Sequence, residues 1–161
     1  VKLPNPGRQI LNPKSFFDDL GKQIGVQKLD DWYNKLNKKL IVHHGGREIL
    51  RSHSSVIDAL VHCYPEHKWI PWKFGNVSSS FWKSVDNQRD FFHWLGQELG
   101  VSQLDDWYAL LSTKAVLQNG GYFINEYYKG SVIEALKACY PQHPWIPWKF
   151  KKLGKNFWQS L

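Results

Sequence analysis

Two cysteine–histidine pairs are the residues whose types and spacing most readily suggest chemistry. Three residues separate Cys63 from His67 and Cys139 from His143, and each pair lies in a twelve-residue phrase, CYPEHKWIPWKF or CYPQHPWIPWKF, with ten identical positions. Cysteine and histidine at this spacing can bind zinc, but zinc needs four ligands, or three and a water molecule. The first half offers four more histidines that have no histidine counterparts in the second half: His43, His44, His53 and His62. The sequence therefore predicts no metal site, but buried cysteines and histidines bonded to backbone near helix ends.

Adjacent carboxylates are the second candidate for chemistry. Asp30-Asp31 and Asp105-Asp106 each directly precede a helical segment. Aspartate is favoured there because it caps free backbone amides and interacts well with the helix dipole. The chain has no nucleophile-elbow, phosphate-loop or zinc-protease motif. We therefore expect helix caps rather than catalytic residues, and neither an enzyme nor a bound cofactor.

Both candidates recur because the chain repeats itself. The segment FFDDLGKQIGVQKLDDWY from Phe16 matches FFHWLGQELGVSQLDDWY from Phe91 at an offset of 75 residues, which becomes 76 after one insertion. Self-similarity at this period is typical of modular arrays. We predict that the chain is a piece of a longer array. It would begin with an N-terminal extension (residues 1–15), followed by repeat 1 (16–74). A connector with the start of repeat 2 (75–90), repeat 2 (91–150) and the start of a possible third repeat (151–161) would follow.

Each repeat reads as three helices. Apolar residues spaced as one helical stripe predict a helix that is capped by Asp86 or Asn87 and ended by Gly100. A second helix is expected from Trp107 to Leu117. A third is expected from the capping-box residue Ser131 until Pro141 stops it. The predicted fold is all-α, with two tandem three-helix repeats joined by aromatic and proline-rich connectors.

The bulk composition indicates a folded and basic protein. The 161 residues carry a net charge of +7, and residues 1–74 hold 12 Lys and Arg against 7 Asp and Glu. No apolar run approaches the ~20 residues that span a bilayer. Two cysteines are too few for a disulfide framework. We therefore expect no membrane partner and an intracellular location, in the nucleus or an organelle. The basic net charge favours phosphate-rich partners.

Aromatic residues make up 16% of the chain. We expect most of them to fill two small cores, as Trp32 and Trp107 would, whereas Trp72 and Trp148 either pack on the preceding helix or face outward. Rings beside cations suit phosphate contact and stacking on unpaired bases. The two copies differ most in the loop before the third helix, where partner-reading residues are expected. The candidate contact residues are Arg47, Arg51, His53, Ser54, Trp72, Lys73, Tyr122, Tyr127, Tyr128, Lys129, Trp148, Lys149, Lys151, Lys152 and Lys155.

The order of motifs also resembles a known group of repeats. The matching residues of the second copy are Leu95-Gly96, Asp106-Trp107-Tyr108, Gly120-Gly121, Gly130-Ser131, Ala135-Leu136, Tyr140-Pro141, His143 and Trp145. This pattern resembles short helical repeats associated with homing endonucleases. The resemblance implies DNA binding and carries over no nuclease residue. The first copy departs from it at Ser54, where the second has Gly130.

These observations favour a non-catalytic helical repeat module that binds nucleic acid, with DNA favoured over RNA because of the resemblance. The alternative is a protein–protein interaction scaffold, in which Trp72, Trp148 and the tyrosines are exposed anchors. A third reading is a ligand-binding protein with aromatic platforms, for instance for sugars.

Overall fold

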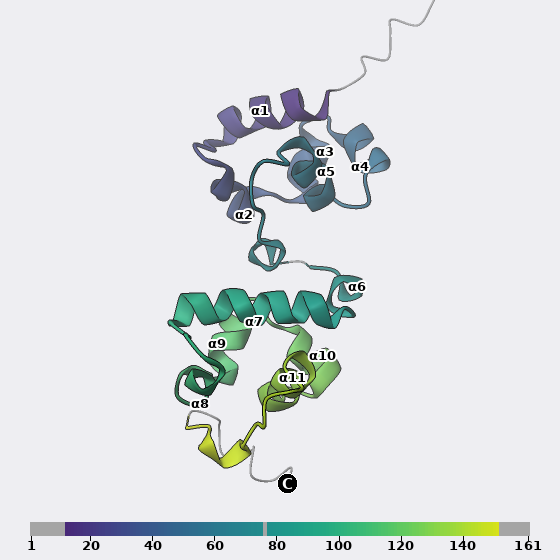
Figure 1. Cartoon of the computed structure of the whole chain (residues 1–161). Helices are drawn as coiled ribbons and strands as arrows, with labels where there is room; N and C mark the ends of the chain where they lie inside the picture. The colour runs from purple at the N-terminus through teal and green to yellow at the C-terminus, as the bar shows by residue number, and fades with distance from the viewer. Residues whose placement is uncertain (1–11, 76, 152–161) are drawn as a thin grey trace, which may run out of the picture. The chain divides into compact units, whose positions relative to one another are not determined.

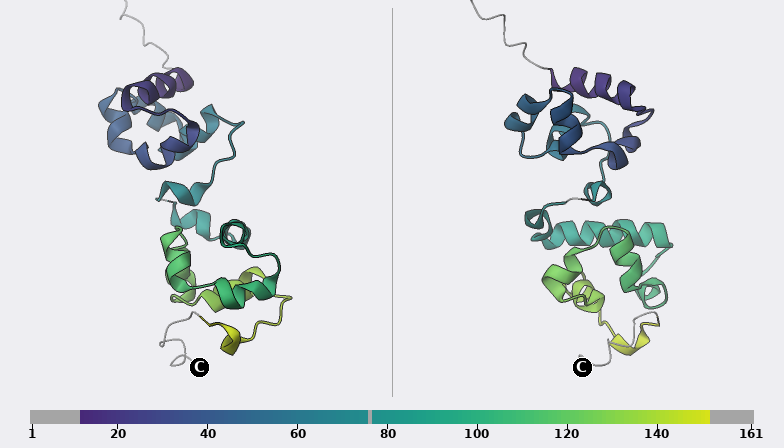
Figure 2. Two further views of the ribbon diagram at one scale, coloured as in Figure 1. Left: turned by 90° about the vertical axis from the view of Figure 1, so that its left-hand side faces the viewer. Right: turned by 180° about the vertical axis from the view of Figure 1, so that it is seen from behind.

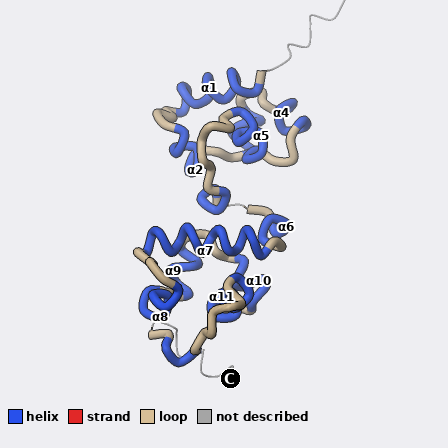
Figure 3. Tube along the Cα trace, viewed as in Figure 1, coloured by secondary structure: helices blue, strands red, loops and turns tan. Residues whose placement is uncertain are grey.

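The computed structural model describes residues 12–75 and 77–151, and within them every regular element is a helix (Figure 3). The predicted all-α class is confirmed. The chain divides into two compact units, Val1–Phe74 (unit 1) and Gly75–Leu161 (unit 2).

Unit 1 is built around a long first helix against which a later helix packs. Helix α1 contacts α5 within this unit, and α4 contacts α5 (Figure 1). Its elements in chain order are α1 (Pro13–Ile24), the 3-10 helix η1 (Leu29–Asp31), α2 (Trp32–Lys35), α3 (Lys38–His43), α4 (Arg47–Ser52), α5 (Val56–Cys63) and the 3-10 helix η2 (Pro71–Phe74).

Unit 2 has the same order of elements behind one additional short helix. The longest helix, α7, lies along one side of the unit, and α9, α10 and α11 lie on a single side of it (Figures 1 and 2). The elements are α6 (Ser79–Trp82), α7 (Val85–Leu99), the 3-10 helix η3 (Leu104–Asp106), α8 (Trp107–Leu110), α9 (Thr113–Gln118), α10 (Phe123–Tyr128), α11 (Val132–Cys139) and the 3-10 helix η4 (Pro147–Lys149).

The units hold more and shorter helices than the three that were predicted for each. The expected helix from Trp107 to Leu117 is interrupted at Leu111, whose backbone is extended. Ser112 then starts α9 by accepting a hydrogen bond from the Ala115 amide at 3.0 Å. Asn37 starts α3 in the same way, through the Leu40 amide at 2.8 Å. A capping residue inside an apolar run therefore restarts the helix in a new direction.

The start of helix α7 differs from the prediction, whereas its end agrees with it. Helix α7 is capped by Ser84, which accepts from the Asn87 amide at 3.4 Å, and not by Asp86 or Asn87. Gly100 ends this helix with a left-handed backbone (φ 79°), as predicted. The loop that was expected before the last helix of each unit contains a helix of its own, α4 in unit 1 and α10 in unit 2.

Each core is centred on one buried tryptophan. Trp32 and Trp107 are nearly inaccessible, and each packs edge-on against a buried phenylalanine of the long helix, Phe17 or Phe92. A glycine of the same helix makes this packing possible. A Cβ added at Gly96, for example, would lie 3.2 Å from Cζ2 of Trp107. The Leu-Gly and Asp-Trp-Tyr motifs are thus two sides of one contact, and the predicted core role of these tryptophans is confirmed.

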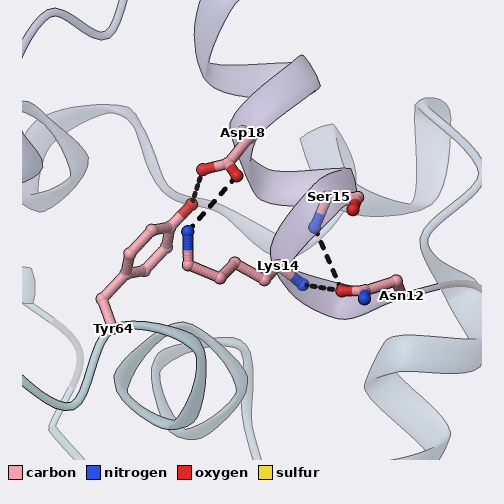
Figure 4. Close-up of polar contacts among 5 residues, drawn as sticks. All are labelled: Asn12, Lys14, Ser15, Asp18 and Tyr64. Carbon is pink, nitrogen blue, oxygen red and sulfur yellow. Dashed lines mark hydrogen bonds and ion pairs between the residues drawn. The ribbon is translucent and has the colours of Figure 1, made fainter.

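A hydrogen bond between distant segments anchors the first helix of unit 1. Asn12 caps α1 by accepting from the amides of Lys14 and Ser15 at 3.0 and 3.2 Å (Figure 4). The Tyr64 hydroxyl donates to Asp18 at 2.6 Å, and Lys14 lies 3.4 Å from the same carboxylate. This bond is the leading reason why the pKa of Asp18 is lowered. The end of α5 is thereby tied to α1.

Candidate nucleic-acid interface

The Gly-Gly turn fixes where α4 and α10 begin. Gly45 and Gly120 have left-handed backbone, with φ of 85° and 91°, which glycine adopts without strain. The second glycine of each pair is required for a different reason. A Cβ on Gly46 would lie 2.6 Å from Cγ2 of Ile41, and one on Gly121 would lie 2.5 Å from Cγ1 of Val116. The helix that follows is therefore held tightly against the unit.

Helix α4 presents two arginines to solvent. Ile49 is buried on its inner side, whereas Arg47 and Arg51 are exposed and lie one helical turn apart, so they share a face. We call these two residues the arginine face. Arg51 donates to Glu48 at 2.5 Å. Within the described residues no carboxylate lies within ion-pair distance of Arg47, so its guanidinium is available to an external anion.

The two other candidates of this segment serve the fold. Nδ1 of His53 lies 3.0 Å from the carbonyl oxygen of Ile49 at the end of α4. The amide and hydroxyl of Ser54 donate to the Asp58 carboxylate at 3.2 and 3.3 Å. These contacts close α4 and start α5, so His53 and Ser54 are occupied within the protein.

Helix α10 occupies the corresponding place in unit 2 but carries tyrosines. Tyr122 is 61% exposed, at the position that matches Arg47. The Tyr127 hydroxyl donates to the carbonyl of Ser79 at 2.9 Å, and the Tyr128 hydroxyl donates to Gln88 at 2.5 Å. The last two tyrosines therefore tie α10 to the start of the unit. Of the three predicted contact tyrosines, Tyr122 is exposed, whereas Tyr127 and Tyr128 are half-buried.

Gln88 and Lys129 are two further unusual residues beside α10. Gln88 is 2% exposed, and its side-chain amide donates to the Trp82 carbonyl at 2.7 Å while it accepts from Tyr128. Lys129 ends α10 with a left-handed backbone (φ 50°), which is uncommon for a residue other than glycine, and its side chain is exposed. Gln88 was missed as a structural residue because it stands on an otherwise polar stretch of sequence.

The two Pro-Trp-Lys-Phe segments differ in what they expose. Trp72 is 7% exposed, so its ring is not part of the accessible surface. Trp148 is 71% exposed. Lys73 and Lys149 are both exposed, with Nζ 5.7 and 5.5 Å from the centroids of a tyrosine ring. Lys151 is also exposed, whereas the candidates Lys152 and Lys155 lie outside the described residues.

The cysteine–histidine phrase builds an aromatic corner in each unit. In unit 1 the Trp69 ring contacts Tyr33 and Phe74 with centroids 5.6 Å away, and the Tyr33 hydroxyl accepts from the Ile70 amide at 2.8 Å. Tyr108, Trp145 and Phe150 repeat these ring contacts in unit 2. The phrase therefore folds back onto the Asp-Trp-Tyr segment of its own unit.

The histidines of this phrase pair with carboxylates, where the sequence had predicted backbone partners. Nε2 of His67 lies 3.1 Å from Oδ1 of Asp30 and forms a hydrogen bond with it, whereas Nε2 of His143 lies 3.1 Å from Oδ1 of Asp105 without hydrogen-bond geometry. The two aspartates of each pair thus divide their roles. Asp31 caps by accepting from the Gln27 and Lys28 amides at 2.9 and 3.1 Å, while Asp30 holds the histidine. Recurrence of both Asp-Asp and His in the two copies was the signal for this contact.

Both cysteines are buried. Burial raises the pKa of Cys63, and it raises the pKa of Cys139 to about 12. Both thiols therefore stay protonated near neutral pH, which disfavours nucleophilic or metal-binding roles. Within residues 12–75 and 77–151 no group of three Cys, His, Asp or Glu side chains could hold a metal ion.

Unit 1 also contains an open hollow of about 430 Å³ between α1 and the following segment. Apolar side chains form its floor and charged side chains its rim. The lining includes Phe17, Trp32, Leu29, Asp18, Lys22 and Lys28. In unit 2 the positions of the two lysines are Gln97 and Gln103. The sequence did not reveal this hollow because its walls come from separate segments.

Comparisons with protein-family models, curated proteins and solved structures each find no match. Among the described helices, none combines the length and apolarity needed to cross a bilayer.

Proposed function

We propose that this chain is a non-catalytic nucleic-acid-binding module, and that the arginine face of unit 1 is its main phosphate contact. The observation that carries the proposal is the pair Arg47 and Arg51, exposed one turn apart on a helix that the Gly-Gly turn holds in place. Guanidinium groups suit phosphate because their planar donors form paired, charge-assisted hydrogen bonds.

The distribution of charge also favours unit 1 as the part of the chain that contacts phosphate. Residues 1–74 hold 12 Lys and Arg against 7 Asp and Glu, whereas residues 75–161 hold 9 against 7. A positive field of this kind raises the rate at which a polyanion encounters the protein. The preference for DNA over RNA rests on the resemblance to homing-endonuclease-associated repeats.

Fluorescence anisotropy with labelled duplex DNA, single-stranded DNA and RNA tests the proposal. Between about 50 and 200 mM salt, affinity should fall roughly 10- to 100-fold, the range expected for two to four phosphate contacts. DNA should bind more tightly than RNA. The proposal fails if nothing binds at low salt, or if affinity does not change with salt.

The second candidate is the protein–protein interaction scaffold. Two large exposed rings, Tyr122 and Trp148, are the observation that favours it. Exposed rings of this size are frequent anchors of protein interfaces. This function would be chosen if nucleic acid does not bind at low salt.

A further inference from the structure

We infer that Trp148 is a stacking platform for an unpaired nucleobase, so that unit 2 gives the protein a preference for single-stranded over duplex nucleic acid. The inference rests on the proposed function and adds the class of nucleic acid to it.

The Trp148 ring is exposed and, among the described residues, stands far in sequence from the other exposed large apolar side chains. It is 71% exposed, and the other large apolar side chains that are exposed within the described residues are Val61, Val85 and Tyr122. None of these lies within 20 residues of Trp148 in the chain. A protein-docking anchor normally sits within a contiguous apolar patch. Trp148 follows the half-buried Ile146 and Pro147 and precedes the exposed Lys149, and an exposed ring beside a cation suits the face of a base.

Tyr108 holds the backbone on both sides of Trp148. Its hydroxyl accepts from the Ile146 amide at 2.8 Å, and its carbonyl accepts from the Lys151 amide at 3.1 Å. The buried ring of Phe150 contacts the Tyr108 ring at a centroid distance of 4.8 Å. At the end of η4, the Phe150 amide also donates to the carbonyl oxygen of Pro147 at 3.2 Å. The indole is therefore mounted on fixed backbone, which lowers the entropic cost of binding.

Two lysines follow Trp148 in the chain. Lys149 and Lys151 are both exposed, and neither has a carboxylate within ion-pair distance among the described residues. Nζ of Lys149 lies 5.5 Å from the centroid of the Tyr108 ring, which places this cation beside the connector. An exposed ring followed by two cations matches a strand of nucleic acid, which presents bases and phosphates together.

Base pairing decides which nucleic acid this surface fits. In a duplex both faces of each interior base are covered by its neighbours, whereas an unpaired base can leave the stack and lie on an indole. The matching position of unit 1 offers no equivalent platform, because Trp72 in the same Pro-Trp-Lys-Phe sequence is 7% exposed. The two units therefore have different roles. The arginine face of unit 1 binds phosphate, and Trp148 of unit 2 selects unpaired bases by stacking on them.

The test compares Trp148→Leu with Trp148→Phe in the full chain. Leucine keeps an apolar side chain without a π face, and phenylalanine keeps the face. Anisotropy is measured at about 200 mM salt, where phosphate contacts are weak, with an oligothymidine and a blunt duplex of equal length. The unsubstituted protein should bind the oligothymidine more tightly. Trp148→Leu should lower that affinity roughly 5- to 100-fold, the range for one stacked base, and Trp148→Phe should restore most of it.

Two controls separate this inference from the proposed function. Far-UV circular dichroism should show that both variants keep their helices, and duplex affinity at low salt should be unchanged. Equal loss for duplex and single strand, or no loss with Trp148→Leu, overturns the stacking role while salt-dependent binding still stands. A change in sedimentation with Trp148→Leu would identify the ring as a contact between protein molecules and also overturn it. If neither probe binds at low salt, both proposals fall.

Discussion

Helices α4 and α10 show how one frame supports two different surfaces. Each follows a Gly-Gly turn, and each buries an isoleucine, Ile49 or Ile124. The outward positions differ, because Arg47 faces solvent where unit 2 has Tyr122. Packing fixes the residues that point inward, whereas the outward residues are free to select a partner. We therefore expect partner-contacting residues at the positions where the two units differ, and residues that stabilise the fold at the positions where they are the same.

The largest effect is expected from the second glycine of each turn. Gly121→Ala should lower the free energy of unfolding by about 3 kcal/mol, because its Cβ would meet the fully buried ring of Phe91 at 2.7 Å. Gly46→Ala should cost a similar amount, about 3 kcal/mol, because its Cβ would meet Cγ2 of the fully buried Ile41 at 2.6 Å and the Ile41 carbonyl oxygen at 3.0 Å.

Urea unfolding followed by far-UV circular dichroism measures both changes. Gly45→Ala is the control: it has open space for a Cβ and should cost only about 1 kcal/mol for its left-handed backbone. If Gly46→Ala and Gly121→Ala are no worse than this control, close packing does not hold α4 and α10 in place.

A smaller effect should distinguish the tyrosines that follow α5 and α11. Tyr64→Phe removes a hydrogen bond to Asp18 and should destabilise unit 1 by about 1 kcal/mol. Tyr140→Phe is the matched control, since unit 2 has His93 at the position of Asp18. Urea unfolding should show a loss for the first variant and almost none for the second. Equal losses would mean that the Tyr64–Asp18 bond does not anchor α1.

The smallest effect concerns acid, and here the two units should behave alike. Hydrogen bonds from backbone amides, those of Gln27 and Gln103 first, lower the pKa of Asp31 and Asp106. Because the folded pKa lies below the unfolded value of about 3.9, these caps stabilise the protein above that value and lose their effect as pH falls through the folded pKa.

The double variant Asp31→Asn, Asp106→Asn should therefore have a lower melting temperature at pH 7 and a weaker fall in melting temperature below about pH 4. Asp19→Asn, on the exposed side of α1, is the control. An unchanged acid profile in the double variant would show that these carboxylates do not act as charged caps.

Much of the helical structure could be predicted from sequence, because helix stripes and helix caps depend on residues close together in the chain. The apolar stripe of α7, the left-handed Gly100 and the cap of α11 at Ser131 could all be inferred from neighbouring residues. The break at Ser112 was missed because apolar residues continue from Trp107 to Leu117 and predict one unbroken helix.

The rest depends on contacts between segments. The pairing of His67 with Asp30 joins positions 37 residues apart, and the recurrence of both residues in the two copies marks them without showing that they meet. The exposure of Trp148 and the burial of Trp72 could not be predicted either, since both stand in the sequence Ile-Pro-Trp-Lys-Phe. Arg47 and Arg51 were named as candidates because the copies diverge there, and the structure shows that both side chains are exposed.

Binding of duplex DNA by two charge-matched double variants tests the central claim most directly. Arg47→Ala, Arg51→Ala removes the arginine face, while Lys114→Ala, Lys137→Ala removes the same charge from exposed positions of unit 2. The control is well matched, since Lys137 pairs with Glu134 three residues away as Arg51 pairs with Glu48. We predict that the arginine variant loses about tenfold in affinity at low salt and that its salt slope falls by about 2, with little change in the lysine variant. Equal losses in the two variants would contradict the account, because binding would then follow net charge and not the arginine face.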